Sequence, residues 1–341
     1  MHPRVLYQTV ISARLEYMWY YMLRTLPIWL KASLIALLIL LISIIHHIYA
    51  YVTPPSLLYI PDNNSSLTEA LNDQGISFNL LDYRLLKRYH RPAEGWVRFD
   101  TQVKLSREEL LQALLDKPRE RTRRLVMYSG DSIQDFATRA GAQTNLLAAK
   151  IIQAYRDYSP YEEGGILAGF YQIPYRTTPT AIAYYMTHRS DERFQTLSRQ
   201  YTGDYDTETW RHILTIASII QKETQNSPEM PLVSSVIHNR LAKEMKLQLD
   251  ATLNYGTYSH TPITPERIKQ DKSHYNTYLH LGLPPHPIGS VSTTALIAAL
   301  NPAKSDYLYF MLADHGTHNF ASTYKEHLAH IRWYKRQKLS K

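Results

Sequence analysis

Residues 213–224 read ILTIASIIQKET, and this stretch decides how the C-terminal part of the chain is interpreted. Its apolar residues recur at the spacing of one helix face, and Glu223 falls on that face, three residues after Ile220 and seven after Ile216. A carboxyl group buried among apolar side chains loses hydration, which raises its pKa towards neutrality. Such a group can act as a general acid near pH 7. A glutamate that turns out to solvent at the helix end is the competing interpretation.

Polar and aromatic residues that follow this stretch suit a carbohydrate ligand. Amides and hydroxyls can hydrogen-bond the hydroxyl and N-acetyl groups of a sugar, while aromatic rings can cover its C–H faces. Gln248 and Asp250 alternate with Leu247 and Leu249, which predicts one face of a β-strand. The candidate substrate-binding residues of this region are Asn239, Gln248, Asp250, Tyr275, Asn276, Thr277 and Tyr278. Taken singly, each of these residue types is also common in an ordinary loop.

Histidine-based chemistry is a rival interpretation. Asp314, His315 and His318 are candidate zinc ligands, with His327 and His330 further along the chain. The 15 histidines nevertheless lack H-E-x-x-H or another established ligand spacing, and no G-x-S-x-G nucleophile elbow occurs. The chain has no cysteine, which excludes thiolate nucleophiles and cysteine-based metal sites. We therefore expect neither a metal nor another cofactor.

Residues 28–45, IWLKASLIALLILLISII, are the most hydrophobic stretch of the chain. Extended to Val52, the run is long enough to cross roughly 30 Å of hydrocarbon as a helix. Four Lys and Arg residues lie at or before its start, against the single acid Glu16, so the positive-inside rule predicts a cytoplasmic N-terminus. A cleaved signal peptide is the competing interpretation. Against it, a 27-residue leader precedes the run and no small-x-small cleavage site follows.

Short helical and strand patterns alternate after the hydrophobic run, which predicts an α+β fold. Capping motifs place helix starts after Ser106, Asp206 and Thr323. A further helix is expected over residues 179–189. Strands are expected at residues 57–60, 125–128 and 307–313. The strand at 125–128 is followed by a Ser-Gly-Asp-Ser turn and two helical stretches, which is the order of a LysM-like α/β module; an unrelated small α+β domain has the same order.

The predicted organisation has four parts: a cytoplasmic tail (1–27), a transmembrane anchor (28–52), a membrane-proximal region with the LysM-like module (53–205) and a mixed α+β catalytic domain (206–341). Charged residues make up 20% of the chain and hydrophobic residues 44%, which excludes a disordered tail and a polytopic membrane protein. The net charge of +8 suits an anionic partner but is too weak over this length to predict nucleic-acid binding.

Several blocks in residues 213–330 resemble motifs of the MltG-type (YceG-like) endolytic murein transglycosylases. The blocks and the family patterns that they resemble are ASIIQKET at 217–224 (A-S-I-V-E-K-E-T), VIHNRL at 236–241 (V-F-x-N-R-L), LQLDAT at 247–252 (L-Q-S-D-P-T), SHYNTY at 273–278 (S-P-Y-N-T-Y), GLPPHPI at 282–288 (G-L-P-P-G-P-I) and HNF at 318–320 (H-x-F). The blocks keep the family's order, and the resemblance adds His318 to the substrate-binding candidates.

The resemblance implies cleavage of peptidoglycan between N-acetylmuramic acid and N-acetylglucosamine without water. Protonated Glu223 would donate to the glycosidic oxygen. The deprotonated carboxylate would then accept the proton of the muramoyl 6-hydroxyl, which attacks to give a 1,6-anhydro end. One carboxyl that serves twice removes the need for the second carboxylate of ordinary glycosidases. Asp250 is a possible second carboxylate, so a hydrolytic muramidase is the alternative.

The chain departs from the family pattern most clearly at Gln221, which stands where the family has the first of two glutamates. Only the second, Glu223, is kept, and helical spacing and resemblance both point to it. If the first were the essential acid, the chain would be an inactive peptidoglycan-binding scaffold of the wall-synthesis machinery. Ala251 and His274 replace prolines, and His286 replaces a glycine.

Location and partners follow from the anchor and the resemblance. We expect a single-pass protein of the cytoplasmic (inner) membrane, with its catalytic domain on the outer, periplasmic side. The expected partners are peptidoglycan glycan strands and the membrane itself. The resemblance adds penicillin-binding proteins and glycan polymerases.

Overall fold

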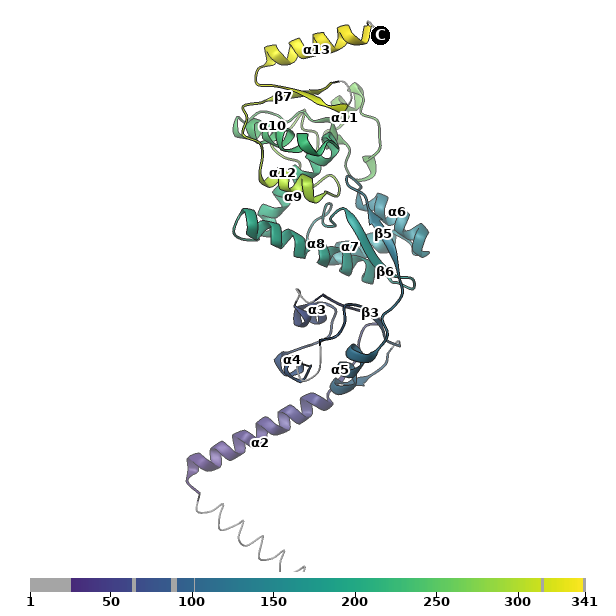
Figure 1. Ribbon diagram of the computed structural model, residues 1–341, viewed down its shortest axis with the longest axis vertical. Helices are drawn as coiled ribbons and strands as arrows, with labels where there is room; N and C mark the ends of the chain where they lie inside the picture. Colours follow the sequence, from purple (N-terminus) through teal and green to yellow (C-terminus); the bar gives the residue numbers. More distant parts are fainter. Residues whose placement is uncertain (1–25, 63–65, 87–90, 101, 314–315, 340–341) are drawn as a thin grey trace, which may run out of the picture. The chain divides into compact units, whose positions relative to one another are not determined.

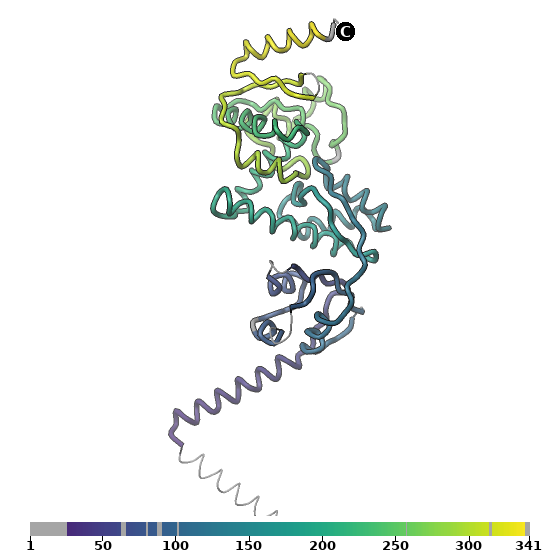
Figure 2. Tube along the Cα trace, viewed as in Figure 1, coloured from purple at the N-terminus to yellow at the C-terminus, as the bar shows by residue number. Residues whose placement is uncertain are grey.

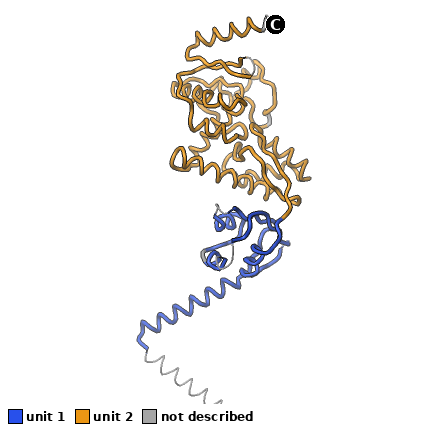
Figure 3. Tube along the Cα trace, viewed as in Figure 1, with its two compact units in different colours: residues 1–119 blue, residues 120–341 orange. Residues whose placement is uncertain are grey.

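The computed structural model describes residues 26–62, 66–86, 91–100, 102–313 and 316–339. The predicted cytoplasmic tail therefore lies almost entirely outside the described residues. The chain divides into two compact units, Met1–Arg119 and Glu120–Lys341, which Figure 3 colours separately.

Helix α2 (Ile28–Tyr49) is the one helix in the described parts of the chain that is long and apolar enough to cross a membrane. It begins after Pro27, and its 22 residues span about 33 Å at 1.5 Å per residue. None of its residues is buried, so its leucine and isoleucine side chains have no protein core to cover them. An exposed apolar helix of this length fits a membrane anchor.

The rest of the first unit is a small α+β domain. Its antiparallel strand pairs are β1 (Tyr51–Val52) with β4 (Leu105–Ser106) and β2 (Leu57–Ile60) with β3 (Gly95–Arg98). Its helices are α3 (Leu67–Asp73), α4 (Leu80–Leu86) and α5 (Arg107–Asp116). The Ser106 capping box that opens α5 is present, as predicted. Near the end of α2, His47 Nε2 lies 3.0 Å from the buried carboxylate of Asp82, which Arg107 also contacts at 3.0 Å.

The second unit begins with two helices packed beside a two-stranded sheet (Figures 1 and 2). The elements in order are β5 (Thr122–Met127), α6 (Ile133–Thr144), α7 (Ala148–Tyr158) and β6 (Gly169–Pro174), with β5 antiparallel to β6. Leu125 pairs with Tyr171 and both are buried, so one sheet face belongs to the core. This strand–helix–helix–strand order contains the predicted strand and two helices; its LysM-like identity stays a prediction.

Helix α8 (Pro179–Tyr201) follows and packs on α7. It is 23 residues long, whereas the sequence pattern predicts a helix only as far as residue 189. Buried Phe194 and Leu197 continue its core-facing side beyond that point. The charged residues between 189 and 193 conceal this continuation in the sequence.

Helix α9 (Thr207–Glu223) is the central element of the remaining residues. It starts at Asp206, which caps it as predicted by accepting from Thr209 N. Every residue from Leu214 to Gln221 is buried, so the helix is enclosed on all sides rather than along one stripe. Its largest contacts are with α12 (Thr293–Leu300) and α10 (Met230–Ala242).

Short elements complete the unit around this helical core. They are the 3₁₀ turns η1 (Ser227–Glu229), η2 (Asp250–Leu253) and η3 (Gly256–Tyr258), the helices α11 (Pro265–Gln270) and α13 (Tyr324–Leu339), and the antiparallel strands β7 (Tyr309–Leu312) and β8 (His318–Ala321). The expected strand at 247–250 is wrong, because Gln248 has φ +49° and the chain turns there into η2. The strand predicted at 307–313 is present as the shorter β7.

Backbone hydrogen bonds join the β5–α6 loop to residues 288–291, far away in the sequence. Gly130 N donates to Ser290 O (2.9 Å), Ser290 N donates to Asp131 O (2.7 Å) and Ala168 N donates to Val291 O (2.9 Å). These bonds place the strand–helix–helix–strand segment in the same unit as α9. The unit boundary after Arg119 thus falls inside the region 53–205.

Candidate active site

Glu223 is the last residue of α9, where the enclosed helix reaches a cleft. Burial raises the pKa of its carboxyl to about 7; the Ala251 amide, which donates to Oε1 at 3.2 Å, opposes the rise, and the nearby charge of Asp250 adds to it. A carboxyl with this pKa is present in both protonation states near neutral pH. The environment is the one that the helical spacing predicts, and the catalytic role of Glu223 stays a prediction.

The cleft has a volume of about 540 Å³ and is bordered on one side by β7. Its lining combines aromatic rings with ionisable and amide side chains. The lining residues are Glu223, Arg240, Gln248, Leu249, Asp250, Tyr278, Tyr309, Phe310, Met311, Leu312, His318, Tyr324 and His327. Such a mixture can contact both the polar groups and the C–H faces of a sugar chain.

Four of the eight predicted substrate-binding residues line this cleft together with Glu223. They are Gln248, Asp250, Tyr278 and His318. Tyr278 donates its hydroxyl proton to Asp250 Oδ1 at 2.7 Å. Burial and this hydrogen bond raise the pKa of Tyr278, so the phenol stays protonated. Asp250 is thereby held beside Glu223 in the same cleft.

The other four predicted residues do not line the cleft. Asn239 Nδ2 donates to Ser305 O and Tyr307 O, both at 2.9 Å. Asn276 is fully buried, and its Nδ2 donates to Ile268 O (2.8 Å) and Asp271 O (2.7 Å). Both amides thus stabilise the loop backbone that frames the site.

Thr277 and Tyr275 are likewise engaged with the protein. Buried Thr277 accepts from Leu249 N at 3.1 Å through Oγ1, and its carbonyl accepts from Gln248 N at 3.1 Å. The ring of Tyr275 stacks on Tyr255 with centroids 3.9 Å apart. The SHYNTY block therefore places one of its four predicted residues, Tyr278, in the cleft.

Arg240 and Glu229 are site residues that the sequence interpretation missed. Arg240 is buried, donates to Leu308 O at 2.6 Å, and lies 5.2 Å over the ring of Tyr309. Glu229 accepts from the backbone N (2.9 Å) and Nδ1 (2.8 Å) of His318. Burial opposes the ionisation of Glu229, but the hydrogen bonds from His318 hold its pKa below the usual value. Nδ1 is therefore occupied, and Nε2 is the ring nitrogen of His318 left to a ligand.

Only some of the candidate zinc ligands lie among the residues that the structure describes. Among the residues that the structure describes, no group of three or more His, Asp and Glu is arranged to hold a metal ion. Asp314 and His315 lie outside the described residues. Nδ1 of His318 is engaged with the carboxylate of Glu229.

Comparison with known proteins identifies the family. The sequence model of the YceG-like family matches residues 59–333, which is most of the chain. The chain belongs to the YceG-like family. A crystal structure of a YceG-like protein from Listeria monocytogenes aligns with a TM-score of 0.54 and 24% identity, over 82% of this chain and 99% of that one. At this identity the likeness concerns the fold alone.

Two curated relatives are each named endolytic murein transglycosylase. The protein from Bacillus subtilis (strain 168) is 39% identical over 115 residues, which are 34% of this chain and 32% of the relative. The protein from Streptococcus pneumoniae serotype 2 (strain D39) is 30% identical over 159 residues, or 44% of this chain and 28% of the relative. The chain therefore covers about a third or less of each relative's length.

The departure from the YceG-like pattern at Gln221 has a structural consequence. Gln221 is buried, and its Oε1 accepts from Ser292 N at 3.1 Å, at the start of α12. It is not among the residues that line the cleft. A neutral amide acceptor thus binds the backbone at this position, and Glu223 is the acid of the block that reaches the cleft.

Proposed function

We propose that this protein is a membrane-anchored lytic transglycosylase that cleaves the bond between N-acetylmuramic acid and N-acetylglucosamine in nascent peptidoglycan strands. The observation that carries the proposal is the Glu223 carboxyl, with a pKa of about 7, in a cleft lined by aromatic and polar side chains. Membership of the YceG-like family supports it, and so does the name that the two relatives share, endolytic murein transglycosylase.

In the first step Glu223 acts as a general acid. The protonated carboxyl donates to the glycosidic oxygen while the bond to the muramoyl C1 breaks, and the oxocarbenium-like centre is stabilised by the N-acetyl group of the substrate itself. A carboxyl with the ordinary pKa of 4.5 would be almost fully ionised at pH 7 and would lack this proton. Because its pKa is raised to about 7, Glu223 can still hold this proton at neutral pH.

In the second step the same carboxyl acts as a base. Glu223, now ionised, accepts the proton of the muramoyl 6-hydroxyl, whose oxygen bonds to C1 and closes the 1,6-anhydro ring. The carboxyl returns to its protonated form, so the cycle is balanced without water. The Ala251 amide, which donates to Oε1, stabilises the ionised form between the two steps.

The cleft residues have separate roles in holding the strand. Gln248 offers an amide to the hydroxyl and N-acetyl groups, and His318 offers Nε2 because Glu229 occupies Nδ1. The rings of Tyr278, Tyr309 and Phe310 offer faces and edges to the sugar rings. Asn239 and Asn276 act indirectly, through the backbone of the loops that they stabilise.

The location and partners of the protein belong to the same proposal. Helix α2 would cross the cytoplasmic membrane, with the N-terminus in the cytoplasm and the catalytic domain outside, near newly made glycan. The membrane-proximal region 53–205, with its predicted LysM-like module, would lie on that outer side as well. Penicillin-binding proteins and glycan polymerases would meet the protein there.

The Glu223→Gln variant tests the proposal. With the full chain in detergent and isolated glycan strands as substrate, we expect a loss of strand cleavage of about 10²–10⁴-fold, the usual contribution of a general acid–base group. Glu266→Gln, at an exposed position on α11, is the matched control and keeps its activity. Cleavage that survives in Glu223→Gln contradicts the assignment. If the variant also leaves the cellular phenotype intact, the protein acts as a peptidoglycan-binding scaffold.

A hydrolytic muramidase is the second candidate, favoured by one observation. Asp250 lines the same cleft as Glu223 and raises the pKa of Glu223 through its charge. A second carboxylate in that position suits activation of water or formation of a covalent intermediate. Reducing muramic ends in the digest would establish this function in place of the transglycosylase.

A further inference from the structure

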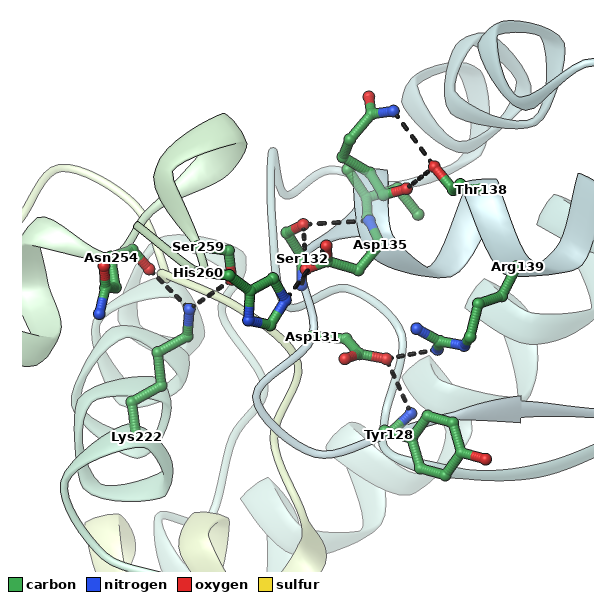
Figure 4. Close-up of polar contacts among 12 residues, drawn as sticks. Tyr128, Asp131, Ser132, Asp135, Thr138, Arg139, Lys222, Asn254, Ser259 and His260 are labelled. Atoms are coloured by element: carbon green, nitrogen blue, oxygen red, sulfur yellow. Dashed lines mark hydrogen bonds and ion pairs between the residues drawn. The ribbon is translucent and has the colours of Figure 1, made fainter. Parts of the chain in front are cut away.

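Two neighbouring residues of α9 hold the two ends of one segment, residues 250–259. Glu223 Oε1 accepts from Ala251 N at 3.2 Å, near the start of the segment. Lys222 Nζ donates to Asn254 O at 2.6 Å and to Ser259 Oγ at 3.0 Å, further along (Figure 4). The segment is therefore attached to the end of the catalytic helix at three points.

The ammonium of Lys222 is enclosed between elements of the second unit. Burial lowers its pKa to about 8, while the charges of Glu163, Asp135 and Asp131 oppose this change, so Lys222 is mostly protonated at pH 7. Asp135 also contacts His260 Nε2 at 3.3 Å, which links the start of α6 to the residue after Ser259 (Figure 4). Because the group is enclosed and bonded, it fixes geometry rather than facing solvent.

We propose that Lys222 is a positioning residue, which holds residues 250–259 so that the Ala251 amide donates to the carboxyl of Glu223. The inference rests on the proposed function, since the ionised form of Glu223 is the base of the second step. Lys222 does not line the cleft, so it acts through the segment and not on substrate. The amide is specific to this chain relative to the quoted family pattern, because L-Q-S-D-P-T has proline at this position and proline has no N–H.

The contacts of Lys222 with Asn254 and Ser259, together with the Ala251 hydrogen bond to Glu223, form a clamp. This clamp predicts a defined effect on the pKa of Glu223. A hydrogen bond to the ionised carboxylate lowers its pKa, and the loss of the bond raises it. The other groups that face Glu223 are Asp250, whose charge acts in the opposite direction to the amide, and Tyr278 and Arg240 in the same cleft. Tyr278 and Arg240 lie outside residues 250–259, whereas Asp250 belongs to this segment, so the contacts of Lys222 position Asp250 together with the Ala251 amide.

The experiment is a double-mutant cycle on the full chain in detergent. Carboxyl ¹³C NMR follows the titration of Glu223, assigned by the signal that disappears in Glu223→Gln. Ala251→Pro removes the donor at the second residue of η2, where the family pattern L-Q-S-D-P-T has proline. We expect its Glu223 titration to move up by about one pH unit. We expect Lys222→Met to move the Glu223 titration in the same direction. In the Ala251→Pro background, we expect Lys222→Met to cause no further shift of this titration.

Two more variants separate position from charge. Ser259→Ala removes one acceptor of Lys222 and no charge, so a smaller upward shift is expected; a purely electrostatic role predicts none. Lys150→Met, at an exposed lysine on α7, leaves the titration unchanged. The pH profile of strand cleavage provides a second readout, because its alkaline limb follows the protonated form of Glu223 and moves up with the titration.

The inference is overturned if Lys222→Met and Ser259→Ala titrate like the parent protein, or if Lys222→Met shifts Glu223 equally with and without the Ala251 amide. The proposed function fails separately, if the parent protein does not cleave strands. In that event the NMR titration still decides whether the clamp exists.

Discussion

At the scale of single residues, the protonation of Glu223 links the stability of the protein to pH. Its pKa is 4.5 in an ordinary environment and about 7 in the folded protein. Below pH 4.5 both states hold the proton, so this group contributes nothing to the pH dependence. As the pH rises from about 4.5 to about 7, the unfolded state ionises first, and the folded state loses stability relative to it.

Glu223→Gln removes this pH-dependent loss. We expect the variant to gain stability over the parent protein by about 1–3 kcal/mol between pH 5 and pH 8, from the size of the pKa shift. Thermal unfolding of both proteins at the two pH values measures the difference. A difference in unfolding free energy that does not change with pH means that the carboxyl is not buried in the folded state.

Residue types and spacing predict some of the site and not the rest. Glu223 could be found because a charge on an apolar helix face is rare, so its position is informative. Gln248, Asp250, Tyr278 and His318 reach the cleft, but the amides of Asn239 and Asn276 come from the same kind of motif and bind loop carbonyls instead. The backbone N–H and C=O groups of irregular loops need hydrogen-bond partners. Polar side chains of these types can serve as those partners as readily as they can bind a sugar.

At the scale of elements, the close approach of residues 288–291 to the β5–α6 loop depends on a missing side chain. A Cβ on Gly289 would lie 2.8 Å from Gly130 O and 3.0 Å from Asp131 O, and both contacts are with backbone that cannot turn away. The backbone hydrogen bonds of Ser290 with Gly130 and Asp131 join the same two segments. Only glycine lets the two backbones come this close.

Gly289→Ala is therefore expected to destabilise the second unit by about 1–3 kcal/mol, the usual cost of forcing extra volume into a packed contact. Gly169→Ala is the matched control, since a Cβ there meets nothing within 4 Å. Chemical denaturation of both variants measures the effect. Equal stabilities of the two alanine variants would contradict the close approach.

Local signals account for the elements that the sequence predicts well. The helix starts at Ser106, Asp206 and Thr323 are present because each depends on a side chain bonding a backbone amide three residues away. The strand at 247–250 is absent because Gln248 adopts a left-handed conformation, which alternation of side chains does not reveal. The backbone N–H of Gln248 donates to Thr277 O, 29 residues later, and this bond belongs to the tertiary structure.

At the scale of the whole molecule, the proposed anchor α2 would decide which side of the membrane the cleft faces. The chain has no cysteine, so one introduced thiol is a unique probe. Ser129→Cys lies at an exposed position of the β5–α6 loop. We expect a membrane-impermeant maleimide to label it in intact spheroplasts, because residues after α2 would lie outside. Labelling that requires lysis would reverse the proposed orientation.

The grouping of residues 120–205 with α9 is the feature of the whole molecule that the sequence did not reveal. Composition shifts near 203–206 suggest a boundary, and the capping residue Asp206 adds to it. The boundary at 205/206 stays a prediction, and backbone bonds between Gly130 and Ser290 and between Ala168 and Val291 join segments on its two sides. Apart from Gly289, which the close approach requires, these bonds use backbone groups that almost every residue type has, so the sequence does not show which two segments pair.

The central claim is that one carboxyl breaks and closes a bond in the glycan without water. Digestion of glycan strands by the full chain in ¹⁸O-labelled water, followed by mass spectrometry of the new muramoyl ends, tests it most directly. We predict 1,6-anhydro ends that carry no ¹⁸O and that disappear with Glu223→Gln. Reducing ends that carry one ¹⁸O atom would contradict the account.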